Sequence, residues 1–356
     1  MNTPLIEVFR YDLPLTRPLP LRGITLDTRS GLIVKISDGP DSTGCGDIAP
    51  LPGFSAESLD EATAAITEWT RRATARGPTE SIEGARCDDL PPSVRFGVET
   101  ATWQFLSPLE RSPDRSGMRR RVPLNALLSG DFEAVGRGAH ALCGAGYRAV
   151  KLKVGAQDVE DDIDCARLVR RILGHDIALR LDANRAWDYA TACRFVQGIG
   201  DLDVEYLEEP LASAGRLWEL AVETSVPLAL DETVVERVGD PAFPADSTWA
   251  GAVVLKPTLL GGTHVAAACA ASAFKAGLKP IISACFESGV GLIALARLAA
   301  LATRYDLPVG LGTYDWLADD VLGTRFHVKE GMLDLDEMAS CLATLDTSKM
   351  TKILHA

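Results

Sequence analysis

The sequence predicts an α/β protein, a (β/α)7–8 barrel with an α+β capping domain formed by the N-terminal segment and part of the C-terminus. Two observations carry this prediction. From Pro123 onward, short apolar segments alternate with helical segments, and their starts are spaced by 24 to 29 residues, the repeat of one strand and one helix in a parallel barrel. The N-terminal segment instead shows strand and helix patterns without this period.

The capping domain is predicted to begin with strands and loops. β-branched and apolar residues predict strands over Ile6–Tyr11 and Gly31–Ser37. The stretches Pro18–Gly23 and Gly44–Phe54 are rich in Gly and Pro and are expected to be irregular loops.

Two helices follow in this domain. Ser58 and Glu61 have the spacing of a capping box and start the first helix, and the second is expected over Val94–Leu106. The capping domain is placed at residues 1–115, with a polar linker over Glu110–Arg121, and the barrel at 120–312. Residues 313–356 are expected to return to the capping domain, with a short strand around Arg325–Val328.

Eight strands are expected in the barrel. An open doubly wound sheet is the alternative, but no strand is followed by the GxGxxG turn of a dinucleotide site. The predicted strands are Pro123–Leu127, Ala149–Val154, Ala178–Asp182, Val204–Glu208, Leu228–Asp231, Ala252–Lys256, Pro280–Ala284 and Pro308–Leu311.

The bulk composition excludes several classes of function. A net charge of −13 argues against a nucleic-acid partner. No apolar run is long enough for a membrane span, and the first residues lack the pattern of a signal peptide. The eight cysteines form no CxxC pair and are expected to be free thiols in a reducing compartment, the cytoplasm. The sequence leaves the oligomeric state open.

Carboxylates end three consecutive strands of the predicted barrel. They are Asp182, Glu208 and Asp231. Because the carboxyl ends of barrel strands meet at one rim, these side chains are expected to converge. Hard oxygen ligands at one point suit a divalent cation such as Mg²⁺. A structural layer of salt bridges with nearby lysines is the alternative.

Lysines on two strands complete the predicted site. Lys151 and Lys153 share one face of the second strand, and Lys256 ends the sixth strand, which lies across the barrel. An exposed edge strand protected by lysines would look similar, but a closed barrel has no edges. Two amines on opposite faces of a bound carbon acid can act as base, acid or electrostatic clamp. The metal and the other cation are expected to push each lysine toward its neutral form.

This set of residues resembles the enolase superfamily in its muconate-lactonizing subgroup. The resemblance lies in Lys151-x-Lys153, Asp182-x-Asn184, Glu208-Glu209-Pro210, Asp231-Glu232 and Lys256. It implies an enolase-type barrel that binds Mg²⁺, or Mn²⁺ as a substitute, through Asp182, Glu208 and Asp231. Asn184 and Glu232 would orient the metal ligands, and Glu209 would either do the same or be structural.

Further motifs resemble the branch of this subgroup that eliminates water. They are Arg22-Gly23, Arg29 to Leu32, Ala49 to Ser55, Ser93 to Glu99, Pro123 to Leu128, Arg180 to Trp187 and Phe286 to Gly289. The resemblance implies a small-molecule carboxylate substrate, 2-succinyl-6-hydroxy-2,4-cyclohexadiene-1-carboxylate, dehydrated to 2-succinylbenzoate in menaquinone synthesis. Lys153 would take the proton and return it to the departing hydroxyl, Lys256 would hold charge against the opposite face, and Lys151 would orient Lys153.

The same motifs suggest substrate contacts. The candidates are Arg22, Leu51, Gly53, Phe54, Arg180, Ser283, Ser288 and Gly289. At position 284 this chain has alanine where relatives often place a serine. Tyr314 and Trp316 are expected either to line the pocket or to pack on the capping domain, and packing is favoured. His264 is not at a strand end, which argues against a histidine-based site.

Two alternative functions remain. A racemase, dipeptide epimerase or cycloisomerase of the same subgroup would need the same lysines and metal, but racemisation would need both Lys153 and Lys256 to move protons. A non-catalytic binding protein on the same fold would be expected to have lost some of these residues, and all of them are present.

Overall fold

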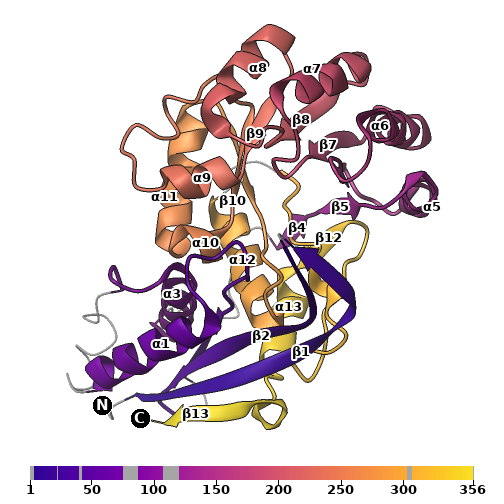
Figure 1. Cartoon of the computed structure of the whole chain (residues 1–356). Coiled ribbons are helices and arrows are strands. Elements are labelled where there is room, and N and C mark those ends of the chain that lie inside the picture. Colours follow the sequence, from indigo (N-terminus) through magenta and orange to yellow (C-terminus); the bar gives the residue numbers. More distant parts are fainter. Residues whose placement is uncertain are drawn as a thin grey trace.

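The computed structural model describes residues 4–21, 23–39, 42–74, 87–106, 120–302 and 307–355. A capping domain with an antiparallel sheet lies beneath a parallel barrel surrounded by helices (Figure 1), which confirms the predicted fold class. Residues 110–119 of the predicted linker lie outside the described residues.

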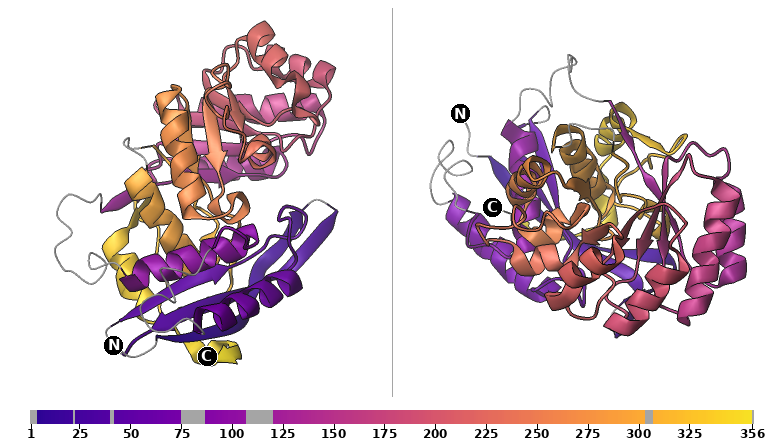
Figure 2. Two further views of the ribbon diagram at one scale, coloured as in Figure 1. Left: turned by 90° about the vertical axis from the view of Figure 1, so that its left-hand side faces the viewer. Right: turned by 90° about the horizontal axis from the view of Figure 1, so that it is seen from above.

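The capping domain is one four-stranded sheet with two helices on one face. The strand order is β13-β1-β2-β3, and β1 pairs antiparallel with both β13 and β2. Apolar side chains of β1 and β2 alternate toward the helices and form a core with Ile66, Trp69 and Val94. Figure 2 (left) shows the two helices lying against the sheet. The elements are β1 (Leu5–Leu21), β2 (Ile24–Ser37), β3 (Thr43–Ile48), β13 (Thr351–His355), α1 (Leu59–Thr74) and α3 (Pro92–Leu106).

The predicted loop at Pro18–Gly23 is wrong, because β1 and β2 continue as one long hairpin to Leu21 and Ile24. β1 pairs with β13 only over Glu7–Arg10. Farther along, no further strand of the described chain lies on that side of β1, apart from an isolated bridge between Leu15 and Leu317, so the missing N–H of a proline costs little there. The hairpin thereby reaches past the sheet toward the barrel.

The predicted loop at Gly44–Phe54 is also wrong in its first half, which forms β3. A Cβ atom on Gly44 would lie 2.0 Å from the Ala101 carbonyl oxygen, and one on Gly46 would lie 1.8 Å from that of Gly97. These two glycines therefore allow β3 to pack directly against the backbone of α3, and they do not mark a turn.

The barrel contains seven parallel strands in sequence order. Their bounds are β5 (Asn125–Leu128), β6 (Ala149–Lys153), β7 (Ala178–Asp182), β8 (Val204–Glu208), β9 (Leu228–Leu230), β10 (Ala252–Leu255) and β11 (Lys279–Ile282). The eighth predicted strand is reduced to two parallel bridges, Ser283 with Gly310 and Leu124 with Val309. These bridges connect β11 to β5 and close the barrel.

Helices connect the strands on the outside of the barrel (Figure 2, right). They are α5 (Phe132–Leu142), α6 (Val159–Leu173), α7 (Tyr189–Gly198), α8 (Leu217–Thr224), α9 (Glu232–Arg237), α10 (Pro257–Leu260), α11 (Thr263–Lys275) and α12 (Gly289–Ala302), with 3-10 turns at Ala214–Arg216, Tyr314–Trp316 and Thr347–Lys349. Within the described residues, no helix combines the length and apolar character needed to cross a bilayer.

The C-terminal segment leaves the barrel and ends in the capping sheet. The strand expected around Arg325–Val328 is absent; the strand of this region is β12 (Met332–Asp334), which pairs antiparallel with β4 (Arg121–Pro123). The helix α13 (Leu335–Leu342) follows, and β13 then pairs with β1.

Candidate active site

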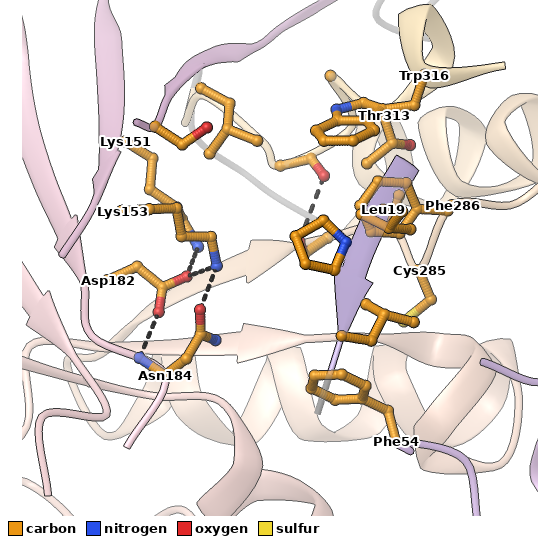
Figure 3. A pocket seen from close by; sticks show the side chains of 18 of the residues that line it. Leu19, Phe54, Lys151, Lys153, Asp182, Asn184, Cys285, Phe286, Thr313 and Trp316 are labelled. Atoms are coloured by element: carbon orange, nitrogen blue, oxygen red, sulfur yellow. Dashed lines mark hydrogen bonds and ion pairs between the residues drawn. The ribbon is translucent and has the colours of Figure 1, made fainter. Parts of the chain in front are cut away.

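A cavity of about 460 Å³ lies between the carboxyl end of the barrel and the capping domain. The barrel strands supply its polar side, which includes Lys151, Lys153, Asp182, Asn184 and Lys256. The β1–β2 hairpin and the loop after β3 supply apolar residues, namely Leu19, Pro20, Leu21, Leu51 and Phe54. Figure 3 shows Lys151, Lys153 and Asp182 on one side and Phe54, Leu19 and Phe286 on the other.

Lys153 is the most accessible of the three lysines. Its side chain is 35% exposed, and its Nζ lies 2.6 Å from Asp182 Oδ2 and 2.6 Å from Asn184 Oδ1 (Figure 3). Asn184 follows β7 with a left-handed backbone, φ 44°, and its N–H donates to Asp182 Oδ1. The turn after β7 thus fixes two acceptors that aim the lysine tip into the cavity.

Lys151 lies one step deeper on the same strand. Its Nζ is 2.6 Å from Glu208 Oε2 and 3.3 Å from Asp182 Oδ2. Burial opposes the ammonium form, but the charges of Glu208 and Asp182 outweigh it and raise the pKa of Lys151 well above its ordinary value. For Asp182, burial is likewise outweighed by Lys153 and Lys151, which lower its pKa. Lys151 is therefore a fixed cation beneath the cavity.

Lys256 lies four strands away, directly after β10, and donates to Asp231 Oδ2. In the eight positions of the barrel this is opposite Lys153, as the sequence predicts. In this structure burial opposes the charge of Lys256, but the charge of Asp231 outweighs it and raises the pKa of Lys256. The expected lowering concerns the site with a cation bound beside the lysine, and it stays a prediction.

Glu209 is buried behind the site and holds the next strand end. Its Oε1 accepts the backbone N–H groups of Asp231 at 3.0 Å and Thr233 at 2.7 Å, and its Oε2 accepts from Arg185 Nε at 3.0 Å. Glu209 has no contact with the cavity, so it positions Asp231 from behind. Glu232 begins α9 beside it, and burial together with Asp231 raises the pKa of Glu232.

Asp182, Glu208 and Asp231 do not form a preassembled metal site in this structure. In the described part of the chain, no three His, Cys, Asp or Glu side chains are grouped closely enough to hold a metal ion. Instead, Asp182, Glu208 and Asp231 each contact a lysine, and Glu208 and Asp231 do not line the cavity.

Glu208 nevertheless shows that negative charge at this point is incompletely neutralised. Its Oε1 is buried without a hydrogen-bond partner. Burial, followed by the charge of Asp182, raises the pKa of Glu208, and Lys151 opposes the shift. An orphaned carboxylate oxygen between two further acids fits a divalent cation, provided that the lysine contacts rearrange when it binds.

Three substrate-contact candidates do line the cavity: Leu51, Phe54 and Ser283. Four others do not. Arg180 is buried inside the barrel, where it binds Glu205 at 2.6 Å and Asn125 at 3.0 Å, so its guanidinium is structural. Ser288 donates to Asp47 and Gly289 to Asp320, at the start of α12, and Gly53 is a turn residue with φ 79°. Arg22 lies outside the described residues.

The sequence missed several residues of the cavity wall. Cys285 and Phe286 follow β11, and Trp316 lies near the end of the barrel, stacked under Arg17 at 3.9 Å. Trp316 thus lines the cavity and also packs against Arg17 of the capping sheet, whereas Tyr314 stacks on Phe326 and does not line the cavity. His264 is exposed and far from the strand ends, as expected. The strand-end rule could have located other missed residues of the cavity wall, among them Leu127, Ser129, Gly155, Ala156, Gly310, Gly312 and Thr313.

Two family profiles match the chain, one described as Enolase C-terminal domain-like over residues 134–339 and one described as MenC, N-terminal domain, over residues 4–105. Two similar solved structures are a muconate lactonizing enzyme from Pseudomonas fluorescens (TM-score 0.78, 24% identity, 92% of each chain covered) and MenC from Desulfotalea psychrophila (TM-score 0.77, 23% identity, 92% of this chain and 99% of that chain). Fold and profiles together define a protein of the enolase superfamily.

Similarity to a curated protein shows which family within this superfamily the chain belongs to. The o-succinylbenzoate synthase of Yersinia pestis (strain Pestoides F) is 34% identical over 319 residues, which cover 88% of this chain and 92% of that protein. The chain belongs to the o-succinylbenzoate synthase family of the enolase superfamily. Sites of this superfamily combine a lysine or histidine base with divalent cations.

Proposed function

We propose that the chain dehydrates 2-succinyl-6-hydroxy-2,4-cyclohexadiene-1-carboxylate to 2-succinylbenzoate, a step of menaquinone biosynthesis. The similarity to a curated o-succinylbenzoate synthase over nearly the whole of both chains supports this reaction. The solved structures are less than 25% identical and support the fold alone.

One observation carries the choice of reaction: the two opposed lysines have different surroundings. Both lysines line the cavity, but the Lys153 side chain is 35% exposed and bonds to an amide oxygen as well as a carboxylate, whereas the Lys256 side chain is 15% exposed and bonds to Asp231. In the proposed reaction Lys256 keeps its proton, and an ammonium can stabilise negative charge but cannot accept a proton. An elimination on one face of the ring needs only one lysine that exchanges protons with the substrate, whereas a racemisation needs two. The arrangement therefore suits the elimination better.

The proposed mechanism assigns both proton transfers to Lys153. Its neutral amine takes the proton from the carbon next to the ring carboxylate, and the resulting ammonium gives that proton to the departing hydroxyl. The C–O bond breaks, water leaves and the ring becomes aromatic. Lys256 stabilises the negative charge from the opposite face, and Asn184 keeps the Lys153 tip in place throughout.

We also propose Mg²⁺, with Mn²⁺ as a substitute, held by Asp182, Glu208 and Asp231. When bound, the cation would stabilise the negative charge that develops on the substrate carboxylate. The oxygen-only donor set and the orphaned Glu208 Oε1 support this choice. The eight free cysteines support the cytoplasm as the compartment.

The test is turnover of freshly prepared cyclohexadiene substrate, followed by ultraviolet absorbance, with Mg²⁺ and with a chelator. We expect turnover by the wild type with Mg²⁺, loss with chelator, and a fall in kcat of at least about 100-fold for Lys153→Ala. Lys279→Ala is the matched control, because Lys279 begins β11 and pairs with Glu205 outside the cavity. No absorbance change with ample Mg²⁺ would favour the non-catalytic alternative.

A second experiment separates dehydration from racemisation. Lys256→Ala is assayed for exchange of the substrate α-proton with deuterium and for turnover, beside a panel of N-acylamino acids and dipeptides. We expect Lys256→Ala to slow turnover, because charge stabilisation is lost, while Lys153 remains the sole route of exchange. Exchange by Lys153→Ala from the opposite face would support a two-base racemase.

A further inference from the structure

Arg29, on β2, is an almost completely buried arginine at the junction of the capping domain and the barrel. Its side chain is 1% exposed. The guanidinium carries five N–H donors, and it makes five hydrogen bonds, all to backbone carbonyl oxygens. Every donor is therefore used, and none goes to a carboxylate.

These carbonyl groups come from two segments of different domains. Nη1 donates to Pro50 at 2.8 Å and Nη2 to Ala49, both in the capping loop that precedes Leu51. Nε donates to Phe286 at 3.1 Å and Nη2 to Cys285 at 3.4 Å, both in the barrel loop after β11. The fifth bond, to Ser30, lies on Arg29's own strand. One planar group thus ties the capping loop to the barrel loop.

The two segments form one apolar wall of the cavity. Leu51 and Cys285 belong to a single buried cluster, with Phe54 and Phe286 packed against it. In Figure 3 this wall faces Lys153 and Asp182 across the cavity. The Phe54 ring also lies 5.9 Å from Lys256 Nζ. The distance between the two walls decides how closely a bound ring is held against Lys153.

We propose that Arg29 is a positioning residue that sets the apolar wall for the substrate ring and tail, acting through the carbonyl groups of Ala49, Pro50, Cys285 and Phe286. This inference rests on the proposed function. Arg29 touches neither the substrate space nor the reacting atoms, so its effect falls on substrate binding more than on the chemical step.

The geometry also explains why lysine cannot replace it. A lysine ammonium presents three donors from one point, whereas the planar guanidinium spreads five donors toward segments on two sides. Arg29→Lys keeps the charge and most of the volume but leaves carbonyl groups of at least one segment without a partner. Arg29→Ala removes all five hydrogen bonds and leaves a cavity into which a free guanidinium ion fits.

Arg170 provides a matched control. It is also buried, and its guanidinium also binds only backbone carbonyl groups, with Nε to Leu202 at 2.9 Å, Nη1 to Ile177 at 2.8 Å and Nη2 to Asp203 at 2.9 Å. None of these acceptors lines the cavity. Arg170→Ala should therefore lower stability without altering substrate binding.

The experiment measures kcat, KM and the melting temperature for wild type, Arg29→Lys, Arg29→Ala and Arg170→Ala. We expect KM to rise about tenfold or more in both Arg29 variants, with kcat changed by less than about threefold, and KM to stay unchanged in Arg170→Ala. Added guanidinium, far below denaturing concentrations, should lower KM in Arg29→Ala alone. If Arg29→Ala does not fold, Arg29→Lys carries the test.

The proposal is overturned if folded Arg29 variants keep the wild-type KM, or if Arg170→Ala raises KM equally. A wild type without dehydratase activity would instead refute the proposed function. The two failures are therefore distinguishable from the wild-type assay alone.

Discussion

Lys151 and Glu208 form an enclosed ion pair under the cavity, with 2.6 Å between Nζ and Oε2 and side chains that are 10% and 1% exposed. Removing one partner of such a pair leaves the other charge buried and unpaired. We expect Lys151→Met to lower the free energy of unfolding by about 3–5 kcal/mol. Urea unfolding in the presence of a chelator measures this without a contribution from bound metal.

The double variant Lys151→Met/Glu208→Gln should lose less free energy of unfolding than the two single variants together, because it removes both charges and leaves neither one unpaired. Arg71→Met is the surface control. Its ion pair with Glu68 on α1 is largely exposed, and its loss should change stability by about 0.5 kcal/mol or less. If the free-energy losses of the two single variants add up to that of the double variant, the two charges do not stabilise each other.

Glu209 should control metal affinity from behind the site, because it binds the backbone N–H of Asp231 and not a ligand side chain. Glu209→Ala removes the acceptor of the Asp231 and Thr233 N–H groups, so Asp231 is no longer fixed. We expect Mn²⁺ affinity to fall about 10–100-fold, measured as free Mn²⁺ by electron paramagnetic resonance. Glu209→Gln keeps an acceptor oxygen and should lose less; equal affinity in all three proteins would remove Glu209 from this role.

The buried Asp47 should make stability depend on pH. Burial raises its pKa to about 6, although hydrogen bonds from Ser288 and Tyr11 oppose the shift. Between about pH 4 and 6 the folded protein then holds a proton that the unfolded chain has released, so the Asp47 contribution to stability falls as pH rises through this window. Asp47→Asn lacks this dependence.

The stability of Asp47→Asn relative to wild type should therefore increase by roughly 1–3 kcal/mol from pH 4 to pH 7. Denaturant unfolding of both proteins at each pH measures the difference. Two curves that stay parallel over this range would mean that Asp47 is already ionised at pH 4.

Gly46→Ala should disrupt the contact between β3 and α3. The added Cβ would lie 1.8 Å from the Gly97 carbonyl oxygen, and a backbone atom cannot move aside as a side-chain tip can. We expect a loss of about 1–3 kcal/mol, seen as a lower melting temperature. Gly215→Ala, whose Cβ meets no atom closer than 3.9 Å, is the control and should melt like the wild type.

The polar side of the cavity could be predicted because strand ends are informative in a parallel barrel. Lys153, Asp182 and Lys256 are charged residues at the ends of apolar strands, so they stand out from their neighbours. The ion pair between Lys256 and Asp231 could not be predicted, since these residues lie 25 positions apart in the chain. The local sequence pattern therefore identifies the charged residues of the site but not which of them form ion pairs with one another.

Only part of the apolar side could be predicted: Leu51 and Phe54 were expected at the site, and the other apolar residues were not, for two physical reasons. Leu19 and Trp316 are apolar residues in a chain full of them, and only the tertiary fold brings their segments to the cavity. Glycine and proline are also ambiguous: Gly46 serves close packing and Pro20 lies at a sheet edge, although both residue types usually indicate turns. Arg29 was noted only as part of a motif, because its role depends on carbonyl groups from distant loops.

The pairing of β13 with β1 has a consequence for synthesis of the chain on the ribosome. Lys352 binds Glu7 across 345 residues, so the first strand emerges long before its outer neighbour. At about 5–20 residues per second this delay lasts roughly 20–70 s. During that time one edge of the nascent sheet is open to strands of other chains, and the prolines and charges along β1 would guard it against aggregation.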